Sequence, residues 1–453
     1  MSALPEQPGL DRQLRSRHVS MIAIGGIIGA GLFVGSSTAI VTAGPAIIVS
    51  YAIAGAVILM IMRMLSEMAV LTPSAGSFTE LIRASLGDAA GRWAAEDVIA
   101  RRTQPFADLS AMDGFAIRFA ERPGPWTVIG ESAAGSSRPE PLSPGQALRI
   151  FTGAPVPEGA DVILVQEDAT RNGDRLVMSG EGPSSVGKHI RPCGSDFAEG
   201  ETLITAGTLL TPARIGLAAT AGHGMLAVRR RVWIAIISTG NELVPPGTDT
   251  GGDRLPSSNA PMLAALLGGA ATRITDLGIA TDRLDAIGAA IDAARDADII
   301  MTIGGASVGD HDLIKPALEA AGSTLDFWKV AMRPGKPLVA GKLGDAIVLG
   351  LPGNPVSAFV TATLFAKPVI AALSGAASPI PAPRPARLAA PVPANGHRTQ
   401  YLRGRWVDGK ALALDDQDSA TLTALSASTL LIVRPANAAA LGEGETVDVL
   451  DIA

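Results

Sequence analysis

Three glycine-bearing loops in the second half of the chain have residue types that suit ligand binding. They span residues 238–242, 304–310 and 350–355, and each directly follows a short apolar run. Glycines such as Gly304 and Gly305 let a ligand approach the backbone closely, and exposed N–H groups in such a loop suit a phosphate. Each loop alone also fits an ordinary strand–helix turn, but the three together predict a site.

Four acidic residues lie in or beside these loops, namely Glu242, Asp282, Asp310 and Asp312. Carboxylates do not attract an anionic substrate directly, but they are suitable Mg²⁺ ligands that bridge to phosphate oxygens. Helix N-terminal capping is the alternative interpretation for Asp282 and for Asp312.

Three cations occur within eight residues, at Lys329, Arg333 and Lys336, and prolines stand at positions 334 and 337. The prolines exclude a regular helix face. A rigid cationic loop suits an oxyanion, and a solvated surface run is the simpler alternative.

The elements that must position these loops alternate between strand and helix from residue 231 to 378. Apolar runs at Val232–Ile237, Asp298–Ile303 and Ala346–Leu349 predict buried strands. The segments that predict helices are Asn259–Leu267, Asp282–Arg295, Leu313–Ala321 and a helix capped by Asn354 with Pro355 in its first turn. This alternation predicts a doubly wound, mainly parallel sheet, so the three loops should line one crevice at the carboxyl ends of its strands.

Smaller β-rich domains are predicted on both sides of this α/β domain. Residues 119–205 contain short apolar runs and an Asn172-Gly173 hairpin signal between Val162–Val165 and Arg175–Met178. Residues 379–453 begin with a proline-rich linker, and residues 91–118 together with 206–230 form a linker lobe. The fold class expected is therefore a multidomain α/β protein.

The N-terminal segment has a different composition. Val19–Met62 contains no Asp, Glu, Lys or Arg, and arginines flank it on both sides. Since a bilayer-spanning helix needs about 20 apolar residues, this run predicts a two-helix transmembrane hairpin broken at Gly44-Pro45, with both flanks cytoplasmic. A signal peptide and a buried hairpin of a soluble protein are the alternatives.

Bulk properties exclude several other functions. The net charge of −6 provides no broad positive field for nucleic acid. The single cysteine, Cys193, cannot form an internal disulfide, and the five histidines are scattered, which disfavours a zinc site.

Six motifs, in this order and spacing, resemble the molybdopterin molybdenumtransferases, the family that includes the C-terminal domain of gephyrin. They are Ser110–Ala116, Thr152–Pro157, Ser238–Leu243, Gly304–Gly309, Arg333–Pro337 and Leu351–Ser357. The resemblance runs from about Gly91 to the C-terminus. Residues 10–93 instead resemble the start of amino-acid permeases, so the chain is expected to be a fusion with residues 1–90 as a permease-like fragment.

The resemblance implies a reaction in which adenylylated molybdopterin and molybdate, assisted by Mg²⁺, give molybdenum cofactor and AMP. The family's catalytic positions fall on Asp113, Thr152, Glu242, Asp282 and Asp312, and its metal ligands on Glu242, Asp310 and Asp312. Substrate or molybdate would be held by Gly304, Gly305, Ser307, Lys329, Arg333, Lys336, Ser357, Arg403 and Ser419. Asp113 and Thr152 would reach the crevice of the other subunit of a homodimer.

Several positions depart from the family pattern. Asn241 stands where an aspartate is common, Ser257 replaces an acidic residue, Phe115 replaces a tyrosine, and Arg333 replaces a frequent lysine. The family's first helix is replaced by permease sequence in which residues 80–86 are expected to form a helix, so we expect a weakened dimer. A membrane-anchored enzyme with its catalytic part in the cytoplasm is the leading hypothesis. A non-catalytic scaffold and an inactive fusion are the alternatives.

Overall fold

The computed structural model describes residues 81–135, 138–249, 252–304 and 313–452, with the side chains of residues 81 and 326–329 left aside. Residues 81–453 form one compact unit. The predicted hairpin at 19–62, and the site residues Gly305, Ser307, Asp310 and Asp312, lie outside the described residues, as does the side chain of Lys329.

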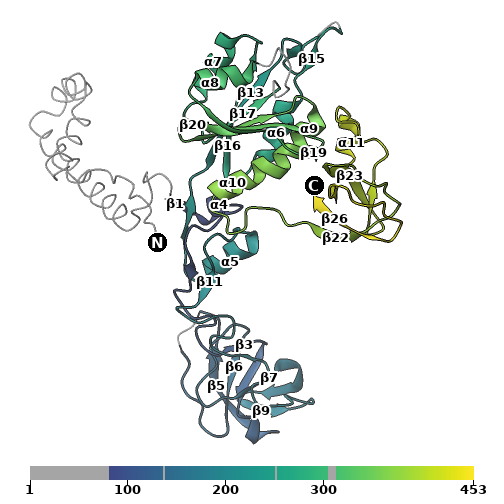
Figure 1. Cartoon of the computed structure of the whole chain (residues 1–453). Helices are drawn as coiled ribbons and strands as arrows, with labels where there is room; N and C mark the ends of the chain where they lie inside the picture. The colour runs from purple at the N-terminus through teal and green to yellow at the C-terminus, as the bar shows by residue number, and fades with distance from the viewer. Residues whose placement is uncertain (1–80, 136–137, 250–251, 305–312, 453) are drawn as a thin grey trace, which may run out of the picture. The chain divides into compact units, whose positions relative to one another are not determined.

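The α/β domain is built on a six-stranded sheet with the order β16-β13-β17-β21-β20-β18 (Figure 1). The pairs β13–β16, β13–β17 and β17–β21 are parallel, whereas β20 and β18 are added antiparallel at one edge. The strands are β13 (Val232–Thr239), β16 (Thr272–Ala280), β17 (Ile299–Ile303), β18 (Thr324–Lys329), β20 (Pro337–Leu343) and β21 (Ala346–Leu351). The predicted mainly parallel sheet is thus confirmed.

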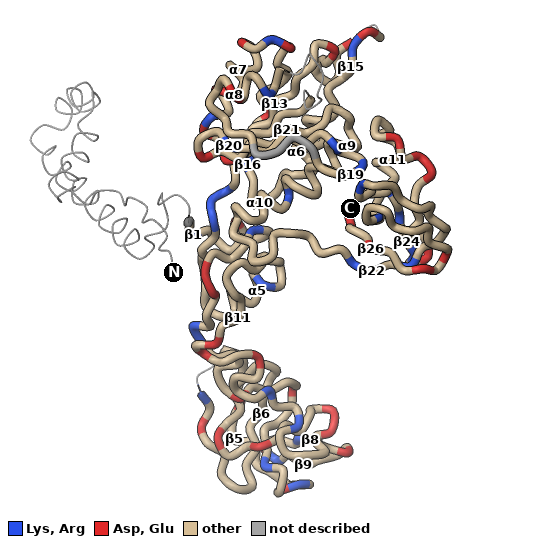
Figure 2. Tube along the Cα trace, in the orientation of Figure 1, with Lys and Arg blue, Asp and Glu red and all other residues tan. Residues whose placement is uncertain are grey.

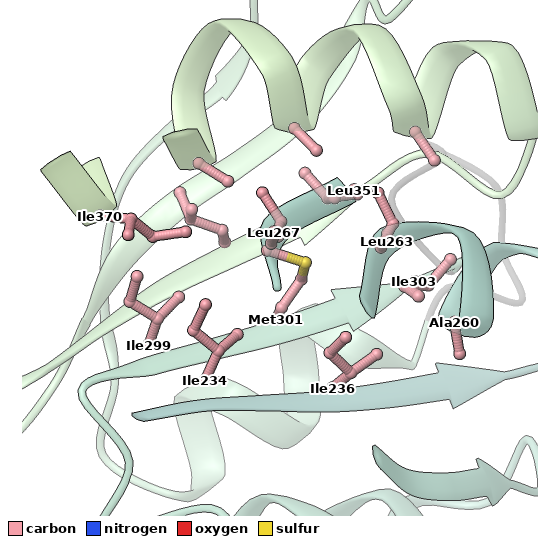
Figure 3. Packing of buried hydrophobic residues seen from close by; sticks show 14 of the residues in the cluster. Ile234, Ile236, Ala260, Leu263, Leu267, Ile299, Met301, Ile303, Leu351 and Ile370 are labelled. Atoms are coloured by element: carbon pink, nitrogen blue, oxygen red, sulfur yellow. The ribbon is translucent and has the colours of Figure 1, made fainter. Parts of the chain in front are cut away.

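Helices cover both faces of this sheet because residues of each strand alternate between two cores. Ile234 and Ile236 pack with α6 (Asn259–Leu267), α9 (Pro355–Thr361), η4 (Ala362–Ala366) and α10 (Lys367–Leu373), as Figure 3 shows. Ala235 and Ile237 pack on the other face with α7 (Leu284–Ala293) and α8 (Ile314–Ala320). Strands β13, β17 and β21 carry no charged residue and are tan throughout in Figure 2, as strands buried on both faces require.

The helix Pro355–Leu373 is, within the described residues, the one segment long and apolar enough to cross a membrane. Half of its apolar window is buried inside the protein, and its residues belong to the core of the α/β domain. Its middle turn is a π-helix, and Pro368 follows in the first turn of α10. Since proline lacks the N–H that an α-helical ladder would use there, the wider turn accommodates it.

A second six-stranded sheet has the order β7-β4-β6-β5-β9-β8. Its elements are β4 (Gly114–Ile117), η2 (Phe119–Glu121), β5 (Trp126–Ser132), β6 (Gln146–Ile150), β7 (Val162–Val165), η3 (Gln166–Asp168), β8 (Ala169–Asn172) and β9 (Arg175–Met178). The Asn172-Gly173 turn does join a hairpin, but its first arm is the polar strand β8, while Val162–Val165 pairs with β4. The predicted pairing of Val162–Val165 with Arg175–Met178 is therefore wrong. Strand β7 pairs with β4, while β9 pairs with β5 and β8.

A lobe of short two-stranded sheets connects these two sheets along the chain. It comprises β1 (Leu81–Ser85), α4 (Leu86–Ala89), β2 (Val98–Ile99), β3 (Leu109–Ser110), β10 (Ile190–Arg191), β11 (Thr202–Ile204), α5 (Pro212–Thr220) and β12 (Met225–Arg229). The helix expected at residues 80–86 is not formed. Residues 81–85 instead pair antiparallel with β12, and Ala84 is buried in the lobe's core. A helix of this length is marginal in isolation, whereas the strand edge of β12 supplies partners for the whole backbone.

The C-terminal sheet has the order β19-β23-β25-β26-β22, with β24 paired to β23. Its elements are β19 (Met332–Arg333), β22 (Arg384–Arg387), β23 (Thr399–Val407), β24 (Lys410–Ala413), α11 (Leu422–Ser426), β25 (Leu430–Arg434) and β26 (Thr446–Asp451). Strand β19 comes from the predicted cationic loop, so that loop is part of this sheet. A two-residue pair, β14 (Leu243–Val244) with β15 (Leu255–Pro256), completes the described strands. The domain boundaries themselves remain predictions.

Candidate active site

A cavity of about 810 Å³ opens at the carboxyl ends of β13, β17 and β21. Chain order reverses direction across the sheet between β13 and β17, which is the switch point where ligands bind in such folds. Four predicted site residues line the cavity: Glu242, Asp282, Gly304 and Ser357. The described parts of the three loops singled out by their glycines therefore meet at one crevice, with Gly304 as the described residue of the second loop.

Two glycines of the crevice are required by its geometry. Gly304 has φ +92°, and a Cβ there would lie 2.8 Å from the carbonyl oxygen of Thr239. Gly240 has φ +147°, and a Cβ there would lie 2.7 Å from both carboxylate oxygens of Glu242. At Gly304 a side chain would collide with the backbone of the adjoining loop, whereas at Gly240 the positive φ itself disfavours any L side chain, so glycine suits both positions.

Asp282 is fixed by a reciprocal pair of hydrogen bonds to Asn241. The backbone N–H of Asn241 donates to Asp282 Oδ2 at 3.0 Å, and the N–H of Asp282 donates to Asn241 Oδ1 at 3.2 Å. The residue preceding α7 is Arg283, which makes no side-chain capping bond. Among the described residues Asp282 makes no helix-capping bond, and its carboxylate ties the loop after β13 to the loop after β16.

The cationic loop is closed by a hydrogen bond from the N–H of Val330 to the carbonyl of Lys336, at 3.0 Å. Gly335 has φ +97°, and a Cβ there would lie 2.5 Å from Thr361 Cγ2. The side chains of Arg333 and Lys336 are exposed, and Pro337 is the residue of this loop that lines the crevice. One backbone hydrogen bond thus closes the loop, while its rigidity and anion binding by its cations stay predictions.

Asp113 and Thr152 lie together on the second sheet, in the turns that precede β4 and follow β6. Asp113 Oδ1 accepts a hydrogen bond from the Thr152 N–H at 2.7 Å and another from Thr152 Oγ1 at 2.8 Å. The backbone and then the hydroxyl bond, with the charge of Arg149, lower the pKa of Asp113 below the ordinary aspartate value. Neither residue lines the crevice described above.

Comparison with known proteins decides the family. Profiles of the MoeA N-terminal region (domains I and II), the probable molybdopterin binding domain and the MoeA C-terminal region (domain IV) match residues 61–222, 235–372 and 385–452. A molybdopterin molybdenumtransferase of Haemophilus influenzae is 38% identical over 64% of this chain and 72% of its own length. The chain belongs to the molybdopterin molybdenumtransferase family.

Other relatives extend the match over most of the chain. A molybdopterin molybdenumtransferase of Bacillus subtilis is 33% identical over 81% of this chain and 88% of its own length. The crystal structure of a molybdopterin biosynthesis MoeA protein from Pyrococcus horikoshii OT3 matches with a TM-score of 0.70 at 26% identity, covering 82% of this chain and 94% of that chain.

The joint with permease sequence differs from the sequence-based expectation. An amino acid permease profile matches residues 18–95, while the MoeA N-terminal profile already begins at residue 61. Residues 61–95 thus match both families, so the family resemblance does not start at residue 91 as predicted. Strand β1, within the overlap, packs in the transferase lobe.

Arg403, one of the predicted anion-binding residues, has structural partners within the protein. Arg403 is 1% exposed and donates to the carbonyls of Asp416 at 2.9 Å and Thr421 at 3.1 Å. Burial lowers the pKa of its guanidinium. The described contacts therefore make Arg403 a support of the loop that carries Ser419, and direct anion binding by it stays a prediction.

Ser419 is connected to the crevice through Asn354. The side-chain amide of Asn354 donates to Ser419 Oγ at 3.0 Å, and the N–H of Val356 donates to the Ser419 carbonyl at 3.1 Å. Asn354 stands at the N-terminus of α9 as predicted, but its side chain makes no capping bond because it is turned to Ser419. The C-terminal domain thereby holds the start of a crevice helix.

Two crevice residues were not predicted as site residues. Ser238 is 1% exposed, lines the cavity, and its hydroxyl has no hydrogen-bond partner among the described residues. Asn259 donates to the Gly353 carbonyl at 2.6 Å, while its buried Oδ1 has no partner within the described part of the chain. The sequence does offer a signal for Asn259, since Ser257-Ser258-Asn259 is a polar run at the start of a predicted helix.

The departures from the family pattern have local explanations at two positions. The side-chain oxygen Oδ1 of Asn241 accepts a hydrogen bond from the Asp282 N–H, and a carboxylate oxygen of an aspartate could accept the same bond. Ser257 is 6% exposed and lines the cavity. Within the described residues no group of three His, Cys, Asp or Glu side chains forms a metal cluster, and two of the predicted ligands, Asp310 and Asp312, lie outside them.

Proposed function

We propose that this protein inserts molybdate into adenylylated molybdopterin and releases AMP, giving molybdenum cofactor. The observation that carries the proposal is the glycine-walled crevice at the switch point, lined by Glu242 and Asp282 in a chain of the molybdopterin molybdenumtransferase family. Its volume of about 810 Å³ is within the range typical of small-molecule sites, which runs from about 300 to 1,000 Å³.

The chain's own residues would bind and orient the reactants. The walls at Gly240, Gly304 and Gly353 admit a planar or phosphate-bearing group close to the backbone. Arg333, Lys336 and Lys329 supply positive charge for the dianionic molybdate, and hydroxyl donors such as Ser357 complete an oxyanion site. Hydrolysis of the phosphoanhydride by water then releases AMP and leaves the phosphate on molybdopterin as the dithiolene of the substrate takes up molybdate, and no side-chain nucleophile is needed.

We further propose that Mg²⁺ assists, held by Glu242 with Asp310 and Asp312. The fit rests on donor chemistry, because Glu242 and Asp282 bring carboxylate oxygens, which hard divalent cations prefer, to the crevice from two neighbouring strand ends. When bound, Mg²⁺ would polarise the phosphoanhydride and stabilise the departing AMP. Asp282 would orient the Glu242 loop through its bonds to Asn241.

A homodimer is proposed to complete the site. Asp113 and Thr152 belong to the second sheet and do not line the crevice of their own α/β domain. A role for them in catalysis is consistent with a second copy presenting this pair to the crevice, as the family resemblance implies. Residues 19–62 are proposed to anchor the chain to a membrane, with the catalytic part in the cytoplasm.

The reaction is tested by measuring AMP release from adenylylated molybdopterin with detergent-solubilised full chain. We expect release to require both Mg²⁺ and molybdate, and chelation to abolish it. Tungstate is a useful second oxyanion of the same charge and shape, and sulfate a smaller control. Equal AMP release with and without molybdate would show that the chain hydrolyses the anhydride without inserting metal.

A further inference from the structure

Arg149 is a cation beside Asp113 that the proposed chemistry does not use. It lies near the end of β6, directly opposite Phe115 of the antiparallel neighbour β4. Its guanidinium lies over two aromatic rings, 5.1 Å from the centroid of Phe115 and 4.7 Å from that of Phe151. Both distances are within the range of cation–π contact, so the guanidinium contacts both rings.

Two directed hydrogen bonds fix the same group further. Arg149 donates to the carbonyl of Gly114 at 3.0 Å and to the side-chain oxygen of Gln166 at 2.8 Å. Gln166 in turn donates its backbone N–H to the carbonyl of Asp113 at 3.1 Å. The two peptide carbonyls that flank the Asp113–Gly114 junction are thus held from two neighbouring strands.

The Asp113 turn has little freedom apart from these bonds. Gly114 tolerates no side chain, because a Cβ there would lie 2.1 Å from the Leu164 carbonyl oxygen. Asp113 Oδ1 already accepts both bonds from Thr152, whereas Oδ2 accepts none among the described residues. One carboxylate oxygen is therefore fixed and the other is left for a ligand.

We propose that Arg149 is the positioning residue of the Asp113–Thr152 pair, setting the direction of the free Asp113 oxygen. This inference rests on the proposed function, since it assigns Asp113 a part in turnover. Lysine would not replace Arg149, because a single ammonium cannot reproduce the planar fork that donates along two fixed directions while it contacts two rings. Phe115, which lacks the hydroxyl common in the family, offers Arg149 only its ring.

The test compares Arg149→Met, Arg149→Lys and Gln166→Leu in the full chain. Arg171→Met is the matched control, because Arg171 is an exposed arginine of the same sheet, paired with Asp174 at 3.8 Å. The first readout is hydrogen exchange of the Thr152 amide, which reports its bond to Asp113 without any substrate. The second is the pH dependence of kcat/KM for AMP release.

We expect Arg149→Met to speed Thr152 exchange about tenfold, as loss of one well-placed bond would. It should also lower kcat by roughly 10- to 100-fold and move the acid limb of the pH profile upward. In Arg149→Lys the acid limb of the kcat/KM profile should stay near its normal pH, while kcat should fall. Gln166→Leu should speed Thr152 exchange in the same direction to a smaller extent, and it decides the matter if Arg149→Met does not fold.

If Arg149→Met shows the same rate of Thr152 amide exchange and the same acid limb of kcat/KM as Arg171→Met, the proposal is overturned. Equal loss of kcat in both Arg149 variants without movement of the limb or of Thr152 exchange would reduce Arg149 to a general structural role and overturn it as well. Absence of turnover in the unmodified chain would refute the proposed function, while Thr152 exchange would still decide whether Arg149 positions Asp113.

Discussion

The crevice and the Asp113 turn both hold carboxylates by backbone N–H groups, but they are built differently. In the crevice, Asp282 and Glu242 follow two neighbouring strands, and strand order alone brings them to one edge of the sheet. In the second sheet, Asp113 before β4 is oriented by Thr152 after β6 and by the Arg149 network. The first kind of site follows from topology, whereas the second depends on individual hydrogen bonds.

The largest expected effect follows from removing charge in the crevice. Glu242→Gln keeps the shape of a side chain that lies over Gly240 but removes its negative charge. We expect kcat for AMP release to fall by about 10²–10³, the cost typical of losing one preorganised electrostatic group. Thermal unfolding should change little, because Glu242 is exposed.

Glu319→Gln is the matched control, since Glu319 is an exposed glutamate on α8 that pairs with Lys315 at 3.8 Å. It should leave turnover and Mg²⁺ dependence unchanged. Near-normal turnover in Glu242→Gln would remove Glu242 from the metal site and leave the crevice without its main acidic candidate.

A smaller effect is expected in the Asp113 turn, and it should depend on pH. Thr152→Val removes the hydroxyl bond to Asp113 Oδ1 but keeps the backbone bond. Because both bonds favour the ionised carboxylate, loss of one should raise the pKa of Asp113 toward the ordinary value. We expect kcat to fall by about tenfold, corresponding to one lost hydrogen bond to a charged group.

The sign of the pH effect is fixed by the direction of the Asp113 shift. A lowered pKa keeps the carboxylate ionised to more acidic pH, so the acid limb of kcat/KM in the unmodified protein lies below the limb of Thr152→Val. The folding stability linked to this group is present above the unfolded pKa and is lost as pH falls through the folded pKa. An acid limb that moves downward in Thr152→Val would contradict the assignment of that limb to Asp113.

The contrast also explains what the sequence could predict. Apolar runs at 232–237 and 298–303 and their glycine loops located β13, β17 and the crevice from pattern alone, since parallel strands end at one edge. Asp113, Thr152 and Arg149 carry no such periodic signal. Only family resemblance pointed to the first two, and nothing in the pattern pointed to Arg149, because its role depends on a register that the sequence does not specify.

The joint shows a second limit of pattern. Residues 80–86 suit a short helix by composition, yet residues 81–85 form β1 because β12 provides an edge to pair with. The burial of Arg403 and its two carbonyl partners are likewise not apparent from the sequence, while direct anion binding by Arg403, which the family resemblance implies, stays a prediction. For β1, a partner strand distant in sequence decided the outcome.

The stability of the lobe that contains β12 should therefore depend on β1, the strand in the region that also matches permeases. A chain beginning at residue 91 lacks β1 and α4 and exposes the core around the buried Ala84 and Ala89. Loss of the two buried methyl groups alone corresponds to roughly 1.5–2 kcal/mol of unfolding free energy, and loss of the β1–β12 pairing and of the Leu86 contact adds to it. Chemical denaturation of chains 81–453 and 91–453 measures the difference, and equal stability would show that β1 is dispensable.

The smallest effect is expected where the C-terminal domain supports the crevice. Ser419→Ala removes the bond from the Asn354 amide but keeps the main-chain bond from Val356 to the Ser419 carbonyl. Because the backbone link persists, we expect a loss of only about 0.5–1 kcal/mol in the free energy of unfolding. Ser426→Ala, which removes a bond to the Thr423 carbonyl at 2.9 Å on nearby α11, is the control of equal chemistry.

If Ser419 also contacts molybdate, as the family resemblance implies, Ser419→Ala alone should raise the KM for molybdate at unchanged stability relative to Ser426→Ala. Identical KM values in the two variants would limit Ser419 to holding the start of α9, and the crevice would then depend on its sheet-borne residues for the anion.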